Sequence, residues 1–320
     1  MLHDDYRPPF LLRNRHLNTV FAPLFRRQKR PPFVRQRLTT KDGDFLDIDL
    51  LIADDTSPNQ RLVVLCHGLE GSSESQYVLA LAKLFHADNW DVVALNYRGC
   101  SGEMNRLPQM YHSGMTSDLD MVIQHLEAPY QSIGIVGISM GGNLSLVYVG
   151  EQSADISPKI KGLVAISVPT DLVAGVRQIM RPINYVYEQR FLRSLLAKMR
   201  LKSKQYPAIF TTKKIKRVRT LYEFDDTFTA PLHGFKDALD YYTQCSSGRF
   251  IDQIRVPTLI INALDDPFLP SACYPQDAVQ NNSYVDLLTP KYGGHVGFVE
   301  FGQSYYWEER RSLQFLNQLC

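Results

Sequence analysis

The stretch Gln131–Gln152, QSIGIVGISMGGNLSLVYVGEQ, decides the fold class of this chain. Its first half is a short apolar run, which predicts a buried β-strand that ends at Ser139. Its second half, from about Leu144, has the pattern of a helix. Ser139 therefore lies at a strand-to-helix turn, inside the pattern G-x-S-x-G at residues 137–141. Such a turn strains the backbone of the serine and lifts its hydroxyl clear of the sheet, as a nucleophile requires.

Apolar strands and helical patterns alternate on both sides of this stretch. Strands are expected at Arg61–Gly68, Asp91–Gly99, Lys161–Pro169, Val256–Leu264 and Ser283–Pro290, and helices at Ser75–Asp88, Ser117–Ala128 and Leu144–Gln152. Continuous apolar strands separated by helices indicate a mostly parallel, doubly wound sheet that is covered on both faces. An antiparallel hairpin over Leu38–Ile52, turning at Asp42-Gly43, precedes them.

The alternation stops between Asp171 and Phe250, where the chain is helical in pattern, basic and aromatic. We expect this insertion to form a helical cap between two strands of the sheet. The predicted organisation begins with an N-terminal arm that wraps the surface (residues 1–37). The first part of the core (38–170), the cap (171–250) and the second part of the core (251–320) follow.

The bulk composition excludes several classes of protein. The 320 residues are 44% hydrophobic, which is enough for one large core with an insertion. With 35 basic and 33 acidic residues the net charge is +2, so no global field attracts nucleic acid. Five scattered cysteines indicate reduced thiols, with no metal-binding spacing. The chain shows no signal peptide and no run near the ~18 apolar residues of a membrane span, which predicts a cytoplasmic location.

A serine hydroxyl needs a positioned base to take its proton and a carboxylate to orient that base. Asp266 follows the strand Val256–Leu264 and lies at the sheet edge where parallel strands place their sites. We prefer it to Asp265 because it occupies the small-x-x-Asp register after Ala263. His295 lies in the glycine-rich segment YGGHVGF, after the last strand. The order Ser, acid, His predicts the triad Ser139, Asp266 and His295 of an α/β-hydrolase fold.

Negative charge develops on the carbonyl oxygen during acyl transfer, and backbone N–H groups stabilise it. The amide of Met140 should supply one donor, and the amide of Leu69, in the loop HGLEG after the first buried strand, the other. His67 in this loop is interpreted as a support of the loop. His112 and His233 lie in loops and are candidates for lining the pocket, with structural hydrogen bonding as the equal alternative.

The whole pattern resembles the YheT-like family of α/β-hydrolases. The resemblance rests on RHLNT at residues 15–19, HGLEGSSES at 67–75, NYRGCSGEMNR at 96–106, YHSGMTSDL at 111–119, GISMGGN at 137–143, FDDTFTAPLHGFKDALDYY at 224–242, NALDDPFLP at 262–270 and GGHVGF at 293–298. Asn18 departs from the glutamine usual in relatives. The resemblance implies a carboxylic-ester hydrolase, with acyltransferase activity as an alternative, and a Ser, Asp and His at the positions already reasoned out.

The predicted function is ester cleavage through an acyl-enzyme, without metal or organic cofactor, on a small-molecule or lipid ester. Two alternatives remain open: acyl transfer to an alcohol by the same triad, and a hydrolase-fold binding protein without turnover. Residues 198–219 hold nine basic residues and no acid, and residues 26–37 hold six. We interpret both as solvated surface; contact with anionic lipid is the less favoured alternative. The sequence leaves the physiological ester and the oligomeric state open.

Overall fold

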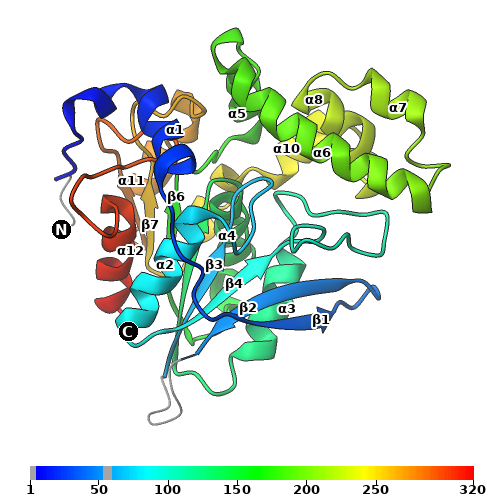
Figure 1. Ribbon diagram of the computed structural model, residues 1–320. Helices are drawn as coiled ribbons and strands as arrows, with labels where there is room; N and C mark the ends of the chain where they lie inside the picture. Colours follow the sequence, from blue (N-terminus) through cyan, green and yellow to red (C-terminus); the bar gives the residue numbers. More distant parts are fainter. Residues whose placement is uncertain (1–4, 53–59) are drawn as a thin grey trace.

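The computed structural model describes residues 5–52 and 60–320, and one eight-stranded sheet organises them (Figure 1). The strand order is β1-β2-β4-β3-β5-β6-β7-β8. β1 (Val34–Thr39) pairs antiparallel with β2 (Phe45–Leu51), and β2 pairs antiparallel with β4. The other pairs are parallel, and their strands are β3 (Arg61–Cys66), β4 (Asp91–Asn96), β5 (Ser132–Ile138), β6 (Ile160–Ile166), β7 (Thr258–Ile261) and β8 (Val285–Leu288). The predicted mostly parallel sheet is confirmed.

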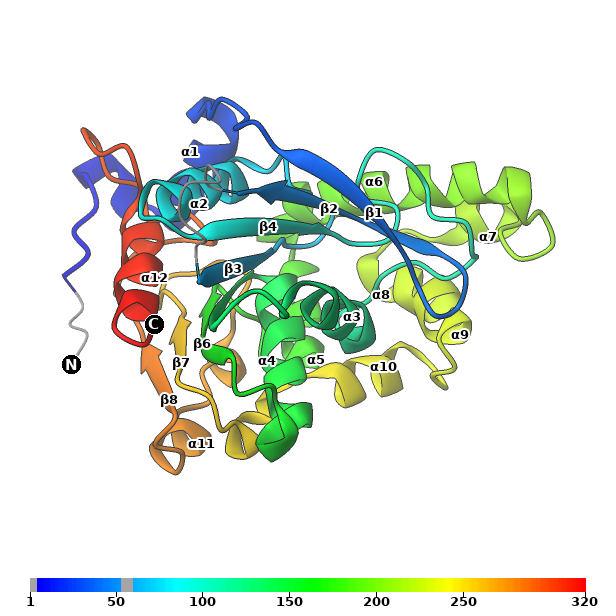
Figure 2. The same cartoon turned by 90° about the horizontal axis from the view of Figure 1, so that it is seen from below.

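Helices cover both faces of the sheet (Figure 2). Successive side chains of a strand point to opposite faces, and β3 accordingly divides its residues between two apolar layers. Leu62 and Val64 pack in one layer, with α3 (Thr116–Leu126) and α4 (Met140–Gln152). Val63 and Leu65 pack in the other, with α2 (Gln76–Ala87) and α12 (Trp307–Asn317). These two layers explain why the central strands are apolar throughout their length.

The chain between β6 and β7 contains no strand, and most of its helices lie beyond the carboxyl ends of the parallel strands (Figure 1). Its helices are α5 (Leu172–Ile179), α6 (Tyr185–Gln205), α7 (Thr212–Arg217), α8 (Leu221–Phe224), a π-helical turn at Asp225–Thr229, α9 (Ala230–Leu232) and α10 (Ala238–Cys245). We call residues 172–245 the inserted helices. A short helix α11 (Gln276–Gln280) lies between β7 and β8.

The N-terminal segment is more ordered than its composition suggests. A 3₁₀ turn at Phe10–Arg13 leads into α1 (Arg15–Phe25), and the side chain of Asn14 caps α1 by accepting from the N–H groups of His16 and Leu17. After α1, the buried guanidinium of Arg26 binds both carboxylate oxygens of Glu309 in α12, at 2.5 and 2.8 Å. The segment is therefore fixed to the far end of the chain.

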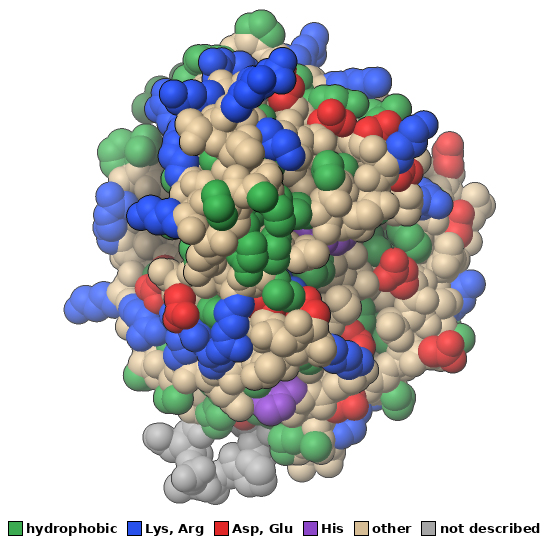
Figure 3. Space-filling model, turned by 90° about the vertical axis from the view of Figure 1, so that its right-hand side faces the viewer, with side chains coloured by type: hydrophobic (Ala, Val, Ile, Leu, Met, Phe, Trp, Pro, Cys, Tyr) green, Lys and Arg blue, Asp and Glu red, His purple; other side chains and the backbone are tan. Residues whose placement is uncertain are grey.

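The interpretation of the basic stretches as solvated surface is wrong for three residues. Arg26 is buried against Glu309, as described above. Lys198 forms a largely buried ion pair with Glu70, and Lys202, fully buried, donates to the carbonyl oxygens of Asn105 and Leu107. Burial lowers the pKa of Lys202 to about 8. The basic side chains of α7 are exposed. On the face of the molecule that lies to the right in Figure 1, basic side chains gather along the upper edge (Figure 3).

Candidate active site

Ser139 occupies a sharp turn between β5 and α4. Its backbone angles are φ 54° and ψ −117°, a strained conformation for a residue with a side chain. The turn brings the start of α4 close against the loop after β3, so that a Cβ on Gly141 would lie 2.4 Å from the carbonyl oxygens of Cys66 and His67. Gly141 is therefore required by close backbone approach, and this approach places Ser139 beside the loop that contains Leu69.

Ser139, His295 and Asp266 form one hydrogen-bonded chain. His295 Nε2 lies 3.0 Å from Ser139 Oγ, and His295 Nδ1 lies 2.8 Å from Asp266 Oδ2. The second oxygen of Asp266, which is buried, accepts from the N–H of Phe268 at 2.8 Å. This arrangement lets the imidazole donate from Nδ1 to the carboxylate and accept the serine proton at Nε2.

Asp265 faces away from the imidazole. Its Oδ1 accepts the N–H of Gly294 at 2.9 Å, and its Oδ2 is buried without a hydrogen-bond partner among the described residues. Burial raises the pKa of Asp265 to about 6. The two adjacent carboxyls thus have different surroundings, and it is Asp266 that the structure brings to His295.

The loop that carries His295 is held by residues far away in the sequence. The N–H of His295 donates to Thr19 Oγ1 at 2.9 Å, and the N–H of Val296 donates to Ser167 Oγ at 2.9 Å. Gly294 has φ 58°, and a Cβ there would lie 2.6 Å from Thr19 Oγ1. The position of Thr19 beneath the histidine was not predicted, and the sequence offered no signal for it beyond its place in the block RHLNT.

The loop after β3 presents the amide of Leu69 between two anchored neighbours. The N–H of Gly68 donates to the hydroxyl of Tyr77 at 3.0 Å, and the N–H of Glu70 donates to the hydroxyl of Tyr111 at 2.9 Å. Across the part of the chain that the structure describes, no hydrogen bond engages the N–H of Leu69 or of Met140. Both residues line the same cavity as Ser139, and neither amide is committed to another hydrogen bond.

His67 supports this loop from below. Its Nδ1 donates to the carbonyl oxygen of Gly68 at 2.7 Å, and its Nε2 accepts from the N–H of Tyr97 at 3.3 Å. Full burial lowers the pKa of His67 to about 3, so the ring is neutral and both nitrogens are occupied. These contacts agree with the supporting role expected for it.

A cavity of about 160 Å³ adjoins Ser139 and His295. The inserted helices supply most of its wall, and its apolar lining includes Leu69, Met110, Met140, Leu172, Val176, Ile179, Phe191, Leu195, Met199, Leu221, Phe224, Phe228, Leu232, Phe268 and Leu269. Such a lining suits a hydrocarbon chain.

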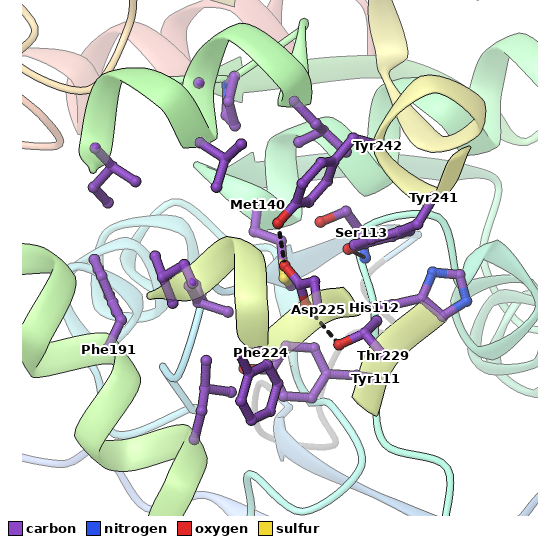
Figure 4. A pocket seen from close by; sticks show the side chains of 18 of the residues that line it. Tyr111, His112, Ser113, Met140, Phe191, Phe224, Asp225, Thr229, Tyr241 and Tyr242 are labelled. Carbon is purple, nitrogen blue, oxygen red and sulfur yellow. Dashed lines mark hydrogen bonds between the residues drawn. The ribbon is translucent and has the colours of Figure 1, made fainter. Parts of the chain in front are cut away.

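One part of the cavity wall is polar (Figure 4). The carboxylate of Asp225 accepts from the hydroxyls of Thr229 and Tyr242, at 2.5 and 2.6 Å. Burial raises the pKa of Asp225 to about 6. Sequence reasoning missed Asp225 as a pocket residue, although it stands in the block FDDTFTAPLHGFKDALDYY.

His112 and His233 both line this cavity, and their ring centroids lie 4.4 Å apart. Burial lowers the pKa of His112 to about 3 and that of His233 to about 4, so both rings are neutral at ordinary pH. Neither is hydrogen-bonded to Ser139, His295 or Asp266. They belong to the wall of the pocket, away from the hydrogen-bonded chain.

Other kinds of site find no support in the described residues. No group of three or more His, Cys, Asp or Glu side chains is arranged to hold a metal ion there. None of the described helices is long and apolar enough to cross a membrane.

The chain is similar to known proteins in sequence and in structure. Residues 61–301 match the family model described as "alpha/beta hydrolase fold". The "Putative esterase YheT" of Escherichia coli (strain K12) is 35% identical over 290 residues, 89% of this chain and 84% of that protein. "Phospholipase ABHD3" of Bos taurus is 29% identical over 292 residues, 88% of this chain and 70% of that protein. The solved esterase Pf2001 of Pyrococcus furiosus has the same fold, with a TM-score of 0.56 at 18% identity over 90% of this chain and 92% of that one.

The chain therefore belongs to the α/β-hydrolase family, and the extent of the likeness to YheT places it in the YheT-like group of that family. Proteins named as esterases, phospholipases and lipases are among its relatives, including "Monoacylglycerol lipase" of Saccharomyces cerevisiae.

Proposed function

We propose that the protein is a serine hydrolase that cleaves carboxylic esters through an acyl-enzyme. The hydrogen-bonded chain from Ser139 Oγ through His295 to Asp266, at the side of an apolar cavity, carries the proposal. The names of its relatives point to the same class of reaction. An ester whose acyl part is a hydrocarbon chain fits the lining best, and the inserted helices, within residues 171–250, would act as the cap above it.

The proposed reaction begins when Ser139 Oγ attacks the ester carbonyl and His295 Nε2 takes the serine proton. Asp266 keeps Nδ1 protonated and stabilises the imidazolium that forms. The carbonyl oxygen becomes an oxyanion that accepts from the amides of Leu69 and Met140. As the tetrahedral intermediate collapses, the carbon–oxygen bond to the alcohol breaks, and the alcohol leaves with the proton from His295.

The second half of the reaction repeats these steps with water as the nucleophile. His295 takes a proton from water, and the resulting hydroxide attacks the acyl-enzyme at the same carbonyl carbon. The second tetrahedral intermediate is held by the same two amides, and its collapse returns the proton to Ser139 Oγ and releases the acid. Each proton that His295 takes is returned, so the enzyme is regenerated.

A fluorophosphonate probe and an ester series test this proposal. We expect covalent labelling of the wild type, no labelling of Ser139→Ala, and unchanged labelling of Ser203→Ala, a control at a half-buried serine of α6 that bonds to the carbonyl oxygen of Arg200. Hydrolysis of p-nitrophenyl esters should disappear in His295→Ala. An unlabelled wild type, or a Ser139→Ala variant that labels equally well, would refute the proposal. Added alcohol that yields new ester faster than free acid would instead assign acyl transfer.

A further inference from the structure

The oxyanion loop, which we define as residues 67–71, is fixed most firmly around Leu69. The amides on either side of the Leu69 amide each donate to a tyrosine hydroxyl, Gly68 to Tyr77 and Glu70 to Tyr111. A further bond, from Gly71 N–H to the carbonyl oxygen of Gly68 at 3.0 Å, closes the turn. The two amides that flank the Leu69 N–H are therefore held in place, and the Leu69 N–H itself can still donate a hydrogen bond to a ligand.

The side chain of Glu70 connects this loop to other parts of the molecule. One carboxylate oxygen accepts from the hydroxyl of Tyr111 and from the ammonium of Lys198, both at 2.7 Å. The other oxygen accepts from the hydroxyl of Ser194. The Glu70 side chain is only 5% exposed, and its backbone has φ 56°, so the network holds it in a conformation that a side chain rarely adopts.

Two of these partners belong to α6, the longest of the inserted helices. Ser194 and Lys198 are four residues apart and therefore lie on one face of that helix. Residues 191, 195 and 199, at the same spacing on the adjacent face, line the cavity. A single rigid helix thus forms both a wall of the substrate cavity and the anchor of the oxyanion loop.

The charge of Lys198 is maintained in this position. Burial by itself would lower its pKa, but the neighbouring Cys100 and the carboxylate of Glu70 outweigh burial and raise it. The Cys100 thiol lies 3.2 Å from the ammonium, and the ring of Tyr111 lies 5.4 Å from it. Charge-assisted hydrogen bonds between largely buried groups fix geometry strongly, because little water competes for either partner.

We propose that Glu70, Lys198 and Ser194 are positioning residues that set the Leu69 amide for the oxyanion, so that the contact between α6 and the oxyanion loop controls the rate of acyl transfer. This inference rests on the proposed function. A positioning role predicts different kinetics from a purely structural ion pair. Loosening the network should reduce the stabilisation of the transition state and leave substrate binding in the apolar cavity almost unchanged.

The test is steady-state hydrolysis of a p-nitrophenyl ester by Glu70→Gln and Lys198→Met. We expect kcat to fall about 10- to 100-fold in each variant, with little change in KM. This fall is no larger than the one caused by removing an oxyanion donor altogether. The rate of inactivation by the fluorophosphonate should fall in parallel, because its phosphoryl oxygen also occupies the oxyanion hole. Ser194→Ala should show a smaller loss in the same direction.

Lys202→Met is the matched control. Lys202 is also buried on α6, one turn further along, but it donates to the carbonyl oxygens of Asn105 and Leu107 and makes no bond to the oxyanion loop. We expect Lys202→Met to lower the melting temperature and to leave kcat near the wild-type value. Thermal melts of every variant, measured alongside, separate loss of fold from loss of rate.

The double variant Glu70→Gln with Lys198→Met completes a double-mutant cycle for kcat. If the two residues act together, the double variant should lose no more kcat than the worse single variant. The inference fails if both single variants, folded by thermal melt, retain wild-type kcat, or if their losses lie in KM alone. It also fails if Lys202→Met loses as much kcat as Lys198→Met. A wild type that neither labels nor turns over would instead refute the proposed function itself.

Discussion

The backbone N–H of His295 donates to Thr19 Oγ1 at 2.9 Å, a bond between residues 276 positions apart. The proton-transfer residue of the proposed reaction is thus held by the first helix of the chain. Thr19 is buried and donates its own hydroxyl hydrogen to the carbonyl oxygen of Arg15, which orients its lone pairs toward the histidine loop.

Thr19→Val should lower kcat about 10-fold, because the imidazole loses one of the bonds that fix its backbone and small displacements of catalytic groups are costly. Ester hydrolysis by the purified variant checks this. Thr19→Ser keeps the hydroxyl and should retain most of the activity. Equal activity of the valine and serine variants would show that the bond has no part in turnover.

Asp266→Asn and Asp265→Asn should differ sharply. Replacing Asp266 removes the carboxylate that holds His295 in the correct tautomer, and we expect kcat to fall by about 10⁴. Asp265 contacts the N–H of Gly294 and not the imidazole, so its replacement should preserve most of kcat. The kcat values of the two variants, measured in one ester assay, show which carboxylate orients His295. A larger loss in Asp265→Asn than in Asp266→Asn would assign this role to Asp265.

Asp225→Asn should stabilise the protein in a pH-dependent way. Burial raises the pKa of Asp225 from 3.8 to about 6, so between these values the folded protein binds more protons at this site than the unfolded chain does. The wild type therefore loses stability from this group as the pH rises from about 4 to about 6, and the penalty is complete above that. Melts at pH 4 and pH 7 should show the advantage of the variant growing by roughly 3–4 °C.

The same comparison has a defined failure. If the difference in melting temperature between Asp225→Asn and the wild type is the same at both pH values, the carboxyl does not titrate in this window. The amide of the variant does not titrate, so any hydrogen bond that it loses to Thr229 or Tyr242 shifts its melting temperature equally at both pH values. The change between pH 4 and pH 7 therefore reports the ionisation of the wild-type carboxyl.

Arg26→Met should destabilise the fold by about 3–5 kcal/mol, because it leaves the carboxylate of Glu309 buried without its cation. Urea denaturation gives the free energy of unfolding directly. Arg27→Met is the control, since Arg27 is exposed and its side chain bonds, among the described residues, to the backbone of Arg26 alone. A variant at Arg26 as stable as the one at Arg27 would contradict the importance of this pair.

Local patterns were sufficient to predict the sheet and its sharp turn. The apolar run before Ser139 and the glycines after it specify a buried strand, a turn and a helix within one short stretch. The carboxyl end of a parallel strand likewise restricts where a carboxylate can act, so Asp266 could be preferred to Asp265 before the contacts were known. These features depend on neighbours in the sequence, which a pattern records.

Features that depend on distant partners were not predictable in the same way. Lys198 belongs to a run of basic residues whose ordinary interpretation is solvent exposure, but its partner Glu70 lies 128 positions earlier. Thr19 lies in an arm of low periodicity, and nothing in the surrounding sequence indicates that it accepts a hydrogen bond from His295. In both cases tertiary contact decides the environment, and no local pattern encodes it.

The links between residues 5–26 and the last part of the chain also bear on biosynthesis. Tyr6 bonds to Val299 and Arg26 to Glu309, as Thr19 does to His295. A ribosome adding about 5–20 residues per second completes these partners on the order of tens of seconds after the first helix has emerged. Throughout that interval the emerging polypeptide exposes a helix whose docking surface does not yet exist. Synthesis of residues 295–309, rather than formation of the central strands, is therefore the step that should commit a nascent molecule to activity.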